Sequence, residues 1–397
     1  MRIIVYDNSG HPFQVQLSRA LANKGHQVLH LFSKSFQTPK GNLIKKEDDP
    51  FTFNIKGLSL SKSFNKYSFF ERWIQEKKFG KLVSKEIESF LPDVLISSNV
   101  PIDTQEYVLN ACKKCNAQFV FWVQDFYGIA IKKILTSKLR FLGSLIGSYY
   151  VYREKQLLRK SDKIILISED FKNILNLWKL SKSNVFVIPN WAPIQEISVE
   201  TKKNSWSEEN DFHDNFCFIY SGTLGLKHNP ELLIELAKEF NQDRNVKVVV
   251  VSEGIGANWL KKKKEECNLQ NLIVMDFQPF EVLPKVFGTA DVLISILEED
   301  AGIYSVPSKV LSYLCAKRAL LLSVPKDNMA AKIVQQFNMG LVSSPNELST
   351  FIEAARLLYE NKKMRTTLGI NSRNYAEKYF NIEDITNQFL NIIKKKE

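Results

Sequence analysis

Short apolar runs, each four to six residues long and rich in Ile, Val and Phe, constrain the fold of this chain most strongly. They recur at 3–6, 94–97, 119–123, 164–167 and 185–188, and again at 216–220, 246–251, 272–275, 292–296 and 320–324. Helix-length amphipathic segments separate them. Runs without polar alternation are typical of parallel strands covered by helices on both faces. The pattern predicts an α/β protein with two tandem, doubly wound, Rossmann-like domains.

A polar stretch divides the two series of strands and sets the predicted domain boundaries. We expect a first domain at 1–192, an exposed linker at 193–215, a second domain at 216–370, and a C-terminal helix at 371–397 that returns towards the first domain. No apolar run reaches the roughly 18 residues needed to span a bilayer. Five scattered cysteines are expected to be reduced, which is typical of a cytoplasmic protein.

The positive charge of the chain is concentrated in its first half. The net charge is +11; residues 1–192 hold 29 Lys and Arg against 16 Asp and Glu, whereas the remainder holds 25 against 27. Residues 131–160 alone carry eight Lys or Arg and one acid among apolar side chains. This segment is predicted to contact an anionic membrane surface, or else its lysine stems cover an ordinary core. Nucleic acid is not an expected partner, because no recognition module is present.

The loop that follows the first strand of the second half has the composition of an anion site. Gly222 allows a tight turn, Lys227 adds a positive charge, and Asn229-Pro230 suits the start of a helix. By itself the segment also fits an ordinary capped turn between a strand and a helix.

A second candidate anion site follows the strand at 292–296. A helix is expected to begin at Pro307 or Ser308, which would place Ser308 and Lys309 at its N-terminus. A solvated surface lysine is the alternative for Lys309. Two lysines and two helix N-termini at one sheet edge match a diphosphate better than a single phosphate.

Three further segments carry weaker signals. Glu253 and Gly254 follow a strand, where a glycine lets a flat base approach the backbone. Gly10 follows the first strand, but a dinucleotide fingerprint needs three glycines there, which argues against an oxidoreductase. Asp125, at the end of the run 119–123, is either a proton acceptor at the sheet edge or the N-cap of the next helix.

Metal and thiol chemistry find no support in the residue spacing. Cys112 and Cys115 have no second ligand pair, the histidines form no ligand pattern, and neither an Asp-x-Asp pair nor a Gly-x-Ser-x-Gly elbow occurs. We expect no metal and no cofactor.

Several segments together resemble glycosyltransferase family 4, whose members are retaining enzymes with the GT-B fold. They are LSRALANKGHQVLHL, LLRKSDKIILISE, VFVIPNW, YSGTLGLKHNPELLIELA, VSEGIG, ADVLISIL and VPSKVLSYLCAKRALLLSV, and they cover essentially the whole length. The segment FWVQDFYG is similar to bacterial exopolysaccharide and O-antigen transferases of the fucosamine or colanic-acid type. The resemblance implies two domains that face across a cleft.

The resemblance also implies residue roles. Lys227 and Lys309 would act on the donor diphosphate, and Asp125 would lie near the acceptor. The implied donor-binding residues are Gly10, Gly222, Thr223, Lys227, Glu253, Gly254, Phe277, Gln278, Ser308, Lys309, Val310 and Ser312. Ser312 stands where the family often has a ribose-binding glutamate, and Gln124 where it often has a histidine.

The function predicted on these grounds is metal-independent transfer of a sugar, with retention, from a UDP-, GDP- or TDP-sugar to a lipid-linked saccharide. The enzyme would work in surface polysaccharide synthesis, peripherally on the inner face of the cell membrane. The alternatives are a nucleotide-sugar epimerase or hydrolase on the same fold, and a non-catalytic membrane-associated partner of a polysaccharide assembly complex.

Overall fold

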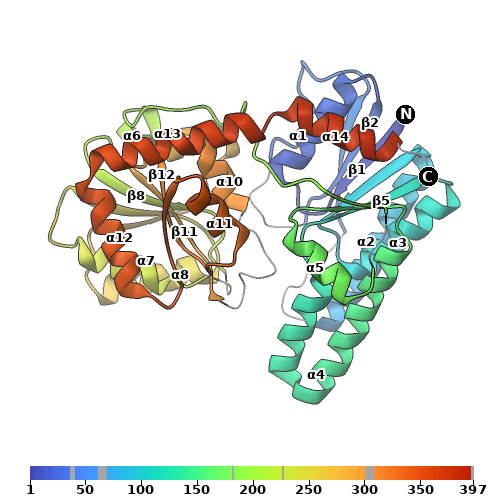
Figure 1. Ribbon diagram of the computed structural model, residues 1–397, viewed down its shortest axis with the longest axis horizontal. Coiled ribbons are helices and arrows are strands. Elements are labelled where there is room, and N and C mark those ends of the chain that lie inside the picture. Colours follow the sequence, from blue (N-terminus) through green and yellow to red (C-terminus); the bar gives the residue numbers. More distant parts are fainter. Residues whose placement is uncertain (36–40, 61–68, 181–182, 226–227, 300–307, 395–397) are drawn as a thin grey trace. The chain divides into compact units, whose positions relative to one another are not determined.

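The computed structural model describes residues 1–35, 41–60, 69–180, 183–225, 228–299 and 308–394. The chain forms two compact units (Figure 1). The first combines Met1–Asn190 with the C-terminal segment that begins at Ile382, and the second is Trp191–Asn381.

The first unit is built on a parallel sheet of seven strands in the order β3-β2-β1-β4-β5-β6-β7. The strands are β1 (Arg2–Asp7), β2 (Gln27–Ser33), β3 (Phe53–Leu58), β4 (Val94–Ser98), β5 (Gln118–Val123), β6 (Lys163–Leu166) and β7 (Val185–Val187). All five residues of β4 and all four of β6 are buried, as expected for strands covered on both faces.

The helices of the first unit include one from the far end of the chain. They are α1 (Pro12–Asn23), α2 (Phe69–Phe90), α3 (Ile102–Lys114), α4 (Tyr127–Arg159), α5 (Asp170–Leu177) and α14 (Ile382–Lys394). Helix α14 lies beside α1 (Figure 1), and Phe389 packs edge-on against Trp122 of β5 with ring centroids 4.9 Å apart.

Helix α4 is a hairpin of two helical limbs that extends away from the sheet (Figure 1). The chain reverses at Arg140, whose φ is 46°. Two glycines of the second limb let the limbs approach closely: a Cβ at Gly143 would lie 1.9 Å from the Leu135 carbonyl oxygen, and one at Gly147 would lie 2.4 Å from the Lys132 Cα. Any larger residue at these glycines would push the limbs apart.

The second unit is built on a parallel sheet of six strands in the order β10-β9-β8-β11-β12-β13. The strands are β8 (Phe216–Ser221), β9 (Val246–Val251), β10 (Leu272–Met275), β11 (Val292–Ile296), β12 (Ala319–Ser323) and β13 (Gly340–Ser343). The helices are α6 (Ser205–Glu209), α7 (Glu231–Glu239), α8 (Ile255–Glu266), the 3₁₀ helix η1 (Phe280–Val282), α9 (Leu283–Thr289), α10 (Ser308–Cys315), α11 (Met329–Gln336), α12 (Leu348–Glu360) and α13 (Lys362–Tyr379). Two doubly wound parallel sheets confirm the predicted fold class.

Three strands were not predicted from the sequence: β2, β3 and β13. β2 contains His30, a polar residue in an otherwise apolar run. The fold accepts this side chain because its Nδ1 lies 2.8 Å from the Ser18 hydroxyl and burial lowers its pKa to about 3, so the ring is neutral. The other two strands are short or only partly buried along their length.

Two other expectations differ from the structure. The stretch expected to be an exposed linker contains α6, whose Trp206 is buried and packs against Phe212 with ring centroids 5.6 Å apart. The Trp206 indole also donates to Gln278 at 3.2 Å and α6 packs against α9, so this stretch is part of the second unit. The single C-terminal helix expected at 371–397 is two helices, since α13 begins at Lys362 and ends at Tyr379. No helix in the described ranges is both long and apolar enough to cross a membrane.

Candidate functional site

The candidate site of the second unit lies at the carboxyl ends of its central strands. The strand order reverses between β8 and β11, and ligands of open parallel sheets bind at such a reversal. Three segments meet there: the loop after β8, the loop after β9, and the N-terminus of α10.

Lys309, the second residue of α10, reaches the loop after β8. Its ammonium group donates to the Tyr220 hydroxyl and lies 3.7 Å from the centroid of that ring. Gly222 lies beside the same lysine side chain: a Cβ built at Gly222 would lie 3.0 Å from Lys309 Cε and 3.2 Å from Nζ. With φ at +135°, Gly222 adopts a backbone conformation that other residues rarely reach. Two of the predicted donor-binding residues are thus in contact, although they lie far apart in the sequence.

Tyr313 fastens α10 to the end of β8. Its hydroxyl accepts a hydrogen bond of 2.8 Å from the Ser221 amide and donates one of 2.9 Å to the Ser221 carbonyl. Burial raises the pKa of this hydroxyl, so it stays protonated. Along the same helix Ser308 is exposed, Val310 is buried and Ser312 is half-buried. The helix that carries Lys309 is therefore held against the loop.

The loop after β9 contacts the loop after β8. The Gly256 amide donates to the Leu224 carbonyl at 3.1 Å, and a Cβ at Gly256 would lie only 2.6 Å from that oxygen. Gly254, with φ at +105°, is the N-cap of α8. Glu253 is exposed and accepts a hydrogen bond of 3.3 Å from the Phe277 amide. The loop expected to approach the base, at Glu253 and Gly254, is thus a neighbour of Phe277, another predicted donor-binding residue.

Two other predicted residues have defined partners. Gln278 accepts from the Trp206 indole at 3.2 Å and donates to the Asp276 carbonyl at 3.1 Å, so both ends of its amide are engaged. Thr223 is exposed, and its carbonyl accepts the Tyr220 hydroxyl proton at 2.8 Å. Lys227 lies outside the described residues, as do 300–307.

In the first unit, Asp7 organises the loop that contains Gly10. The Asp7 carboxylate is buried at the end of β1 and accepts from the amides of Ser9, at 2.9 Å, and His11. Burial raises the pKa of this carboxyl group. Gly10 is buried with φ at +77°. The Ser9 and His11 amides of this loop are thus already hydrogen-bonded to the Asp7 carboxylate. A donor-binding role for Gly10 stays a prediction.

At the end of β5 the structure shows a partner for Gln124 that sequence reasoning missed, Asn190. The buried amides of Gln124 and Asn190 pair with each other: Gln124 Nε2 donates to Asn190 Oδ1 at 3.2 Å, and Asn190 Nδ2 donates to Gln124 Oε1 at 2.5 Å. Asp125, the next residue, is half-buried. The N-cap of α4 is Phe126, so the alternative N-cap role for Asp125 is wrong.

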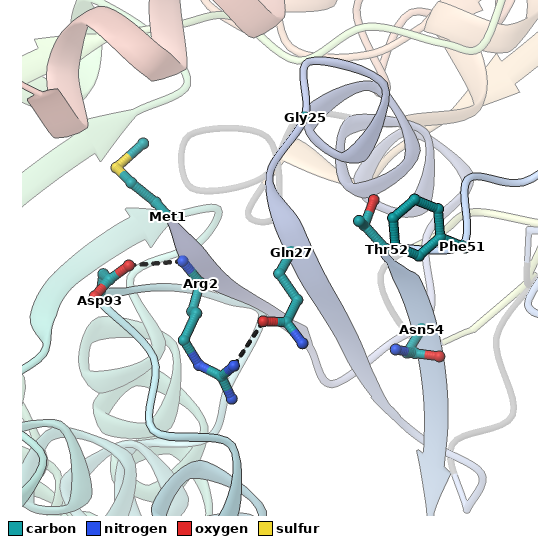
Figure 2. Close-up of a pocket in the computed structure, with 8 residues that line it drawn as sticks. All are labelled: Met1, Arg2, Gly25, Gln27, Phe51, Thr52, Asn54 and Asp93. Atoms are coloured by element: carbon teal, nitrogen blue, oxygen red, sulfur yellow. Dashed lines mark hydrogen bonds between the residues drawn. The ribbon is translucent and has the colours of Figure 1, made fainter.

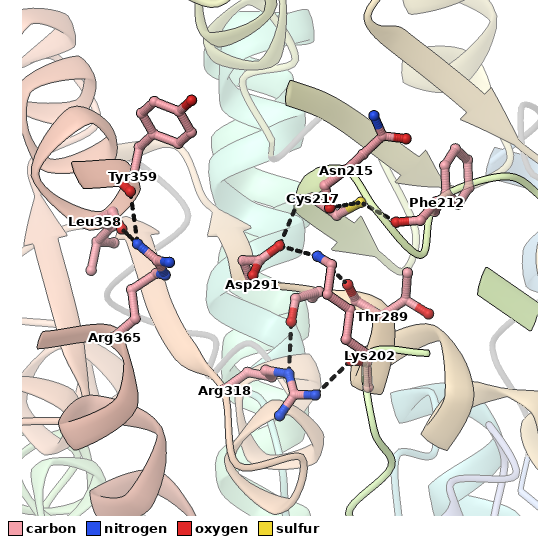
Figure 3. A network of polar contacts seen from close by, with 12 residues as sticks. Lys202, Phe212, Asn215, Cys217, Thr289, Asp291, Arg318, Leu358, Tyr359 and Arg365 are labelled. Carbon is pink, nitrogen blue, oxygen red and sulfur yellow. Dashed lines mark hydrogen bonds and ion pairs between the residues drawn. The ribbon is translucent and has the colours of Figure 1, made fainter. Parts of the chain in front are cut away.

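At the opposite edge of each sheet, where the strands begin, polar side chains bond to one another. Figure 2 shows a hollow at the amino ends of β1, β2 and β3, where Arg2 donates to Gln27 at 2.6 Å and the Arg2 amide donates to Asp93 at 2.7 Å. In the second unit, Lys202 pairs with Asp291, which also accepts from the Cys217 amide at 2.9 Å (Figure 3).

Arg318 belongs to the same amino edge (Figure 3). Its guanidinium donates to the carbonyls of Ala290 at 2.7 Å, Gly288 at 2.6 Å and Glu200 at 3.0 Å. It therefore ties the segment that enters the second unit to the sheet. Within the described ranges, no group of three His, Cys, Asp or Glu side chains could hold a metal ion.

Comparison with known proteins defines the class. Residues 202–375 match the family model described as Glycosyl transferases group 1. Among similar solved structures are sucrose-phosphate synthase from Thermosynechococcus elongatus (TM-score 0.73, 14% identity, 99% of this chain and 98% of that chain) and HepE from Anabaena in complex with UDP-glucose (0.72, 12%, 99% and 99%). A third is WaaG, a glycosyltransferase involved in lipopolysaccharide biosynthesis (0.70, 14%, 99% and 100%). No curated protein sequence matches the chain.

The structural matches span essentially the whole chain and show that the fold is GT-B, as predicted. The second unit carries a domain of the Glycosyl transferases group 1 type. The chain is a glycosyltransferase, which confirms the predicted enzyme class.

Proposed function

We propose that the protein transfers a sugar from a nucleoside diphosphate sugar and that the second unit holds the donor's diphosphate. The observation that carries this proposal is the position of Lys309: a helix N-terminus presents an ammonium group beside the glycine loop at the strand reversal. Helix N-termini and lysine ammonium groups both stabilise phosphate oxygens.

The chemistry follows from the leaving group. When the bond between the anomeric carbon and the diphosphate oxygen breaks, negative charge accumulates on the diphosphate. Lys309 and the N-terminus of α10 would stabilise that charge electrostatically. The acceptor oxygen forms the new bond to the anomeric carbon, and its proton passes to the donor phosphate. We propose Asp125 as the residue that orients the acceptor hydroxyl, and retention as the stereochemical outcome.

The donor is proposed to be a UDP-, GDP- or TDP-sugar. HepE, a similar structure, was solved with UDP-glucose, which supports a donor of this type. A thermal-shift screen against UDP, GDP, TDP and their sugars tests the proposal, because a ligand of the folded state raises the melting temperature. No shift with any of these ligands would contradict it. Fast donor turnover without acceptor would instead favour an epimerase or hydrolase.

We further propose that the hairpin α4 docks on an anionic membrane surface. Large apolar side chains are exposed along both limbs: Ile134, Leu139, Phe141, Leu142, Leu145, Ile146, Tyr149 and Tyr152. Phe141, next to the reversal at Arg140, is 73% exposed. Lys132, Lys133 and Lys138 lie on the first limb, and no acid occurs between 126 and 153. A patch of this composition fits anionic lipid better than a second copy with the same charge.

The base of the hairpin is anchored to the first unit. Tyr150 donates to Asp103 at 2.8 Å, and the Arg153 guanidinium pairs with Asp103 at 2.5 Å and with Glu106. Each Lys or Arg near an anionic surface contributes about 1 kcal/mol, and each apolar side chain that leaves water contributes roughly 1.5–3 kcal/mol. Several such side chains are enough for stable, salt-dependent docking.

Sedimentation with vesicles tests the docking. We expect the protein to bind vesicles that contain phosphatidylglycerol more tightly than pure phosphatidylcholine. Phe141→Ser with Leu142→Ser should weaken binding at all salt concentrations, whereas Lys132→Gln with Lys133→Gln should weaken it mainly at low salt. Leu177→Ser is the matched control, because Leu177 is 81% exposed but lies outside the hairpin. Equal binding by all variants would contradict the proposal.

The acceptor is proposed to be a lipid-linked saccharide, and the process surface polysaccharide synthesis at the cytoplasmic face of the membrane. The hairpin supports a membrane-bound acceptor, and WaaG, which has a similar fold, is involved in lipopolysaccharide biosynthesis. Ser312 on α10 stands where the family that the sequence resembles often has a ribose-binding glutamate. Calorimetry with nucleotide sugars tests whether the site binds the donor with a serine at this position; no binding would contradict the proposal.

A further inference from the structure

Tyr220 lies against the Lys309 ammonium at the carboxyl end of β8. Its side chain is completely buried at the end of β8. The hydroxyl donates to the Thr223 carbonyl at 2.8 Å and accepts from the Lys309 ammonium. Burial raises the pKa of this hydroxyl well above its usual value, so it remains protonated and keeps both bonds.

The geometry restricts a side chain that is otherwise flexible. A lysine side chain loses roughly 2 kcal/mol of rotamer entropy when it is fixed in one conformation. Here the hydroxyl of Tyr220 and the face of its ring, 3.7 Å from Nζ, hold the ammonium beside Gly222 before any ligand arrives. An ammonium has three N–H donors, so the bond to Tyr220 uses only one of them.

We propose that Tyr220 is a positioning residue, which acts through Lys309 by holding its ammonium at the loop after β8 in the orientation that binds the donor's diphosphate. This inference rests on the proposed role of Lys309. Tyr220 itself need not touch the donor, because its hydroxyl is engaged by Thr223 and Lys309.

The test is a double-mutant cycle with Tyr220→Phe and Lys309→Met. Phenylalanine keeps the ring face beneath the ammonium and removes only the hydroxyl. Binding of pyrophosphate, a probe with the charges of the leaving group and no base, is followed by ³¹P NMR titration. Tyr359→Phe is the matched control. It removes a hydroxyl that donates to Asp243 at 2.6 Å in the same unit, away from the loops after β8 and β9 and from the N-terminus of α10.

We expect Tyr220→Phe to weaken pyrophosphate binding about 3- to 10-fold and Lys309→Met to weaken it about 10-fold or more, as for loss of a charge-assisted hydrogen bond. Tyr359→Phe should leave binding unchanged. In the Lys309→Met background, Tyr220→Phe should have no further effect, since a positioning residue acts only through the side chain that it positions.

The other outcomes separate two failures. If Lys309→Met weakens binding but Tyr220→Phe leaves it unchanged or makes it tighter, the inference about Tyr220 is wrong and the diphosphate site stands. If Tyr220→Phe weakens pyrophosphate binding by the same factor in the wild-type and Lys309→Met backgrounds, Tyr220 does not act through Lys309. If Lys309→Met has no effect on binding, the proposed diphosphate site itself is wrong.

Discussion

Replacing Gly222 with alanine should strain the loop after β8. The residue has φ at +135°, where side chains with a Cβ rarely occur, and such backbone conformations cost about 1–3 kcal/mol. For a unit of this size, about 1 kcal/mol corresponds to a change of roughly 2–4 °C in melting temperature. We therefore expect Gly222→Ala to lower the melting temperature of the second unit by about 2–12 °C.

The same substitution should weaken diphosphate binding. The new Cβ would lie 3.0 Å from Lys309 Cε and 3.2 Å from Nζ, which is tight enough to displace the end of this flexible side chain. Pyrophosphate affinity should therefore fall together with stability. Differential scanning calorimetry and a pyrophosphate titration of the same preparation measure the two effects.

Gly225→Ala is the matched control for this prediction. Gly225 lies in the same loop and does not have a positive φ, and a Cβ built there would meet no atom of the described residues within 4 Å beyond its chain neighbours. Alanine there should leave the melting temperature unchanged or raise it slightly, because it restricts the unfolded chain. If Gly222→Ala has the same melting temperature as the wild type, or if Gly222→Ala and Gly225→Ala lower it equally, the Gly222 conformation does not have the role proposed for it.

Three other substitutions have defined outcomes. Lys309→Ala should retain the fold and lower the turnover rate about 10²- to 10³-fold at saturating donor; an unchanged rate would remove Lys309 from the mechanism. Burial raises the pKa of Glu154 to about 8, so the stability that its protonated form contributes is lost as the pH rises from about 4.5 to about 8. In urea denaturation, the stability of the wild type relative to Glu154→Gln should therefore fall by about 1.4 kcal/mol per pH unit in that window, because the contributions of other titrating groups cancel in the difference. Arg318→Ala removes three hydrogen bonds to carbonyls and should cost at least about 2 kcal/mol in urea denaturation without changing pyrophosphate affinity; a change below about 0.5 kcal/mol would contradict its structural role.

Much of the fold could be predicted because its central strands are almost entirely apolar. β9, with the sequence VKVVVV, and β11, with VLISI, are recognisable without any knowledge of their neighbours. β2 could not be recognised in this way, because His30 is acceptable in a buried strand only with a tertiary partner, Ser18. The apolar pattern reports burial, but it does not report which polar groups will be satisfied.

The candidate site shows the same limit. Glycines and lysines next to strand ends were recognisable, and the structure brings Gly222 and Lys309 together. Tyr220 was missed, since it appears in the sequence as an ordinary apolar strand residue, and its contact with Lys309 joins residues 89 positions apart. The pairing of Gln124 with Asn190 was missed for the same reason, because it depends on how β5 and the segment after β7 pack together.

A crystal structure of the protein with a bound nucleoside diphosphate tests the central claim most directly. We predict that the two phosphates lie at the carboxyl edge of the second sheet, within hydrogen-bonding distance of the Lys309 ammonium and next to Gly222. Phosphates bound elsewhere, for example in the hollow beside Arg2 and Gln27, with Lys309 touching only Tyr220, would contradict it.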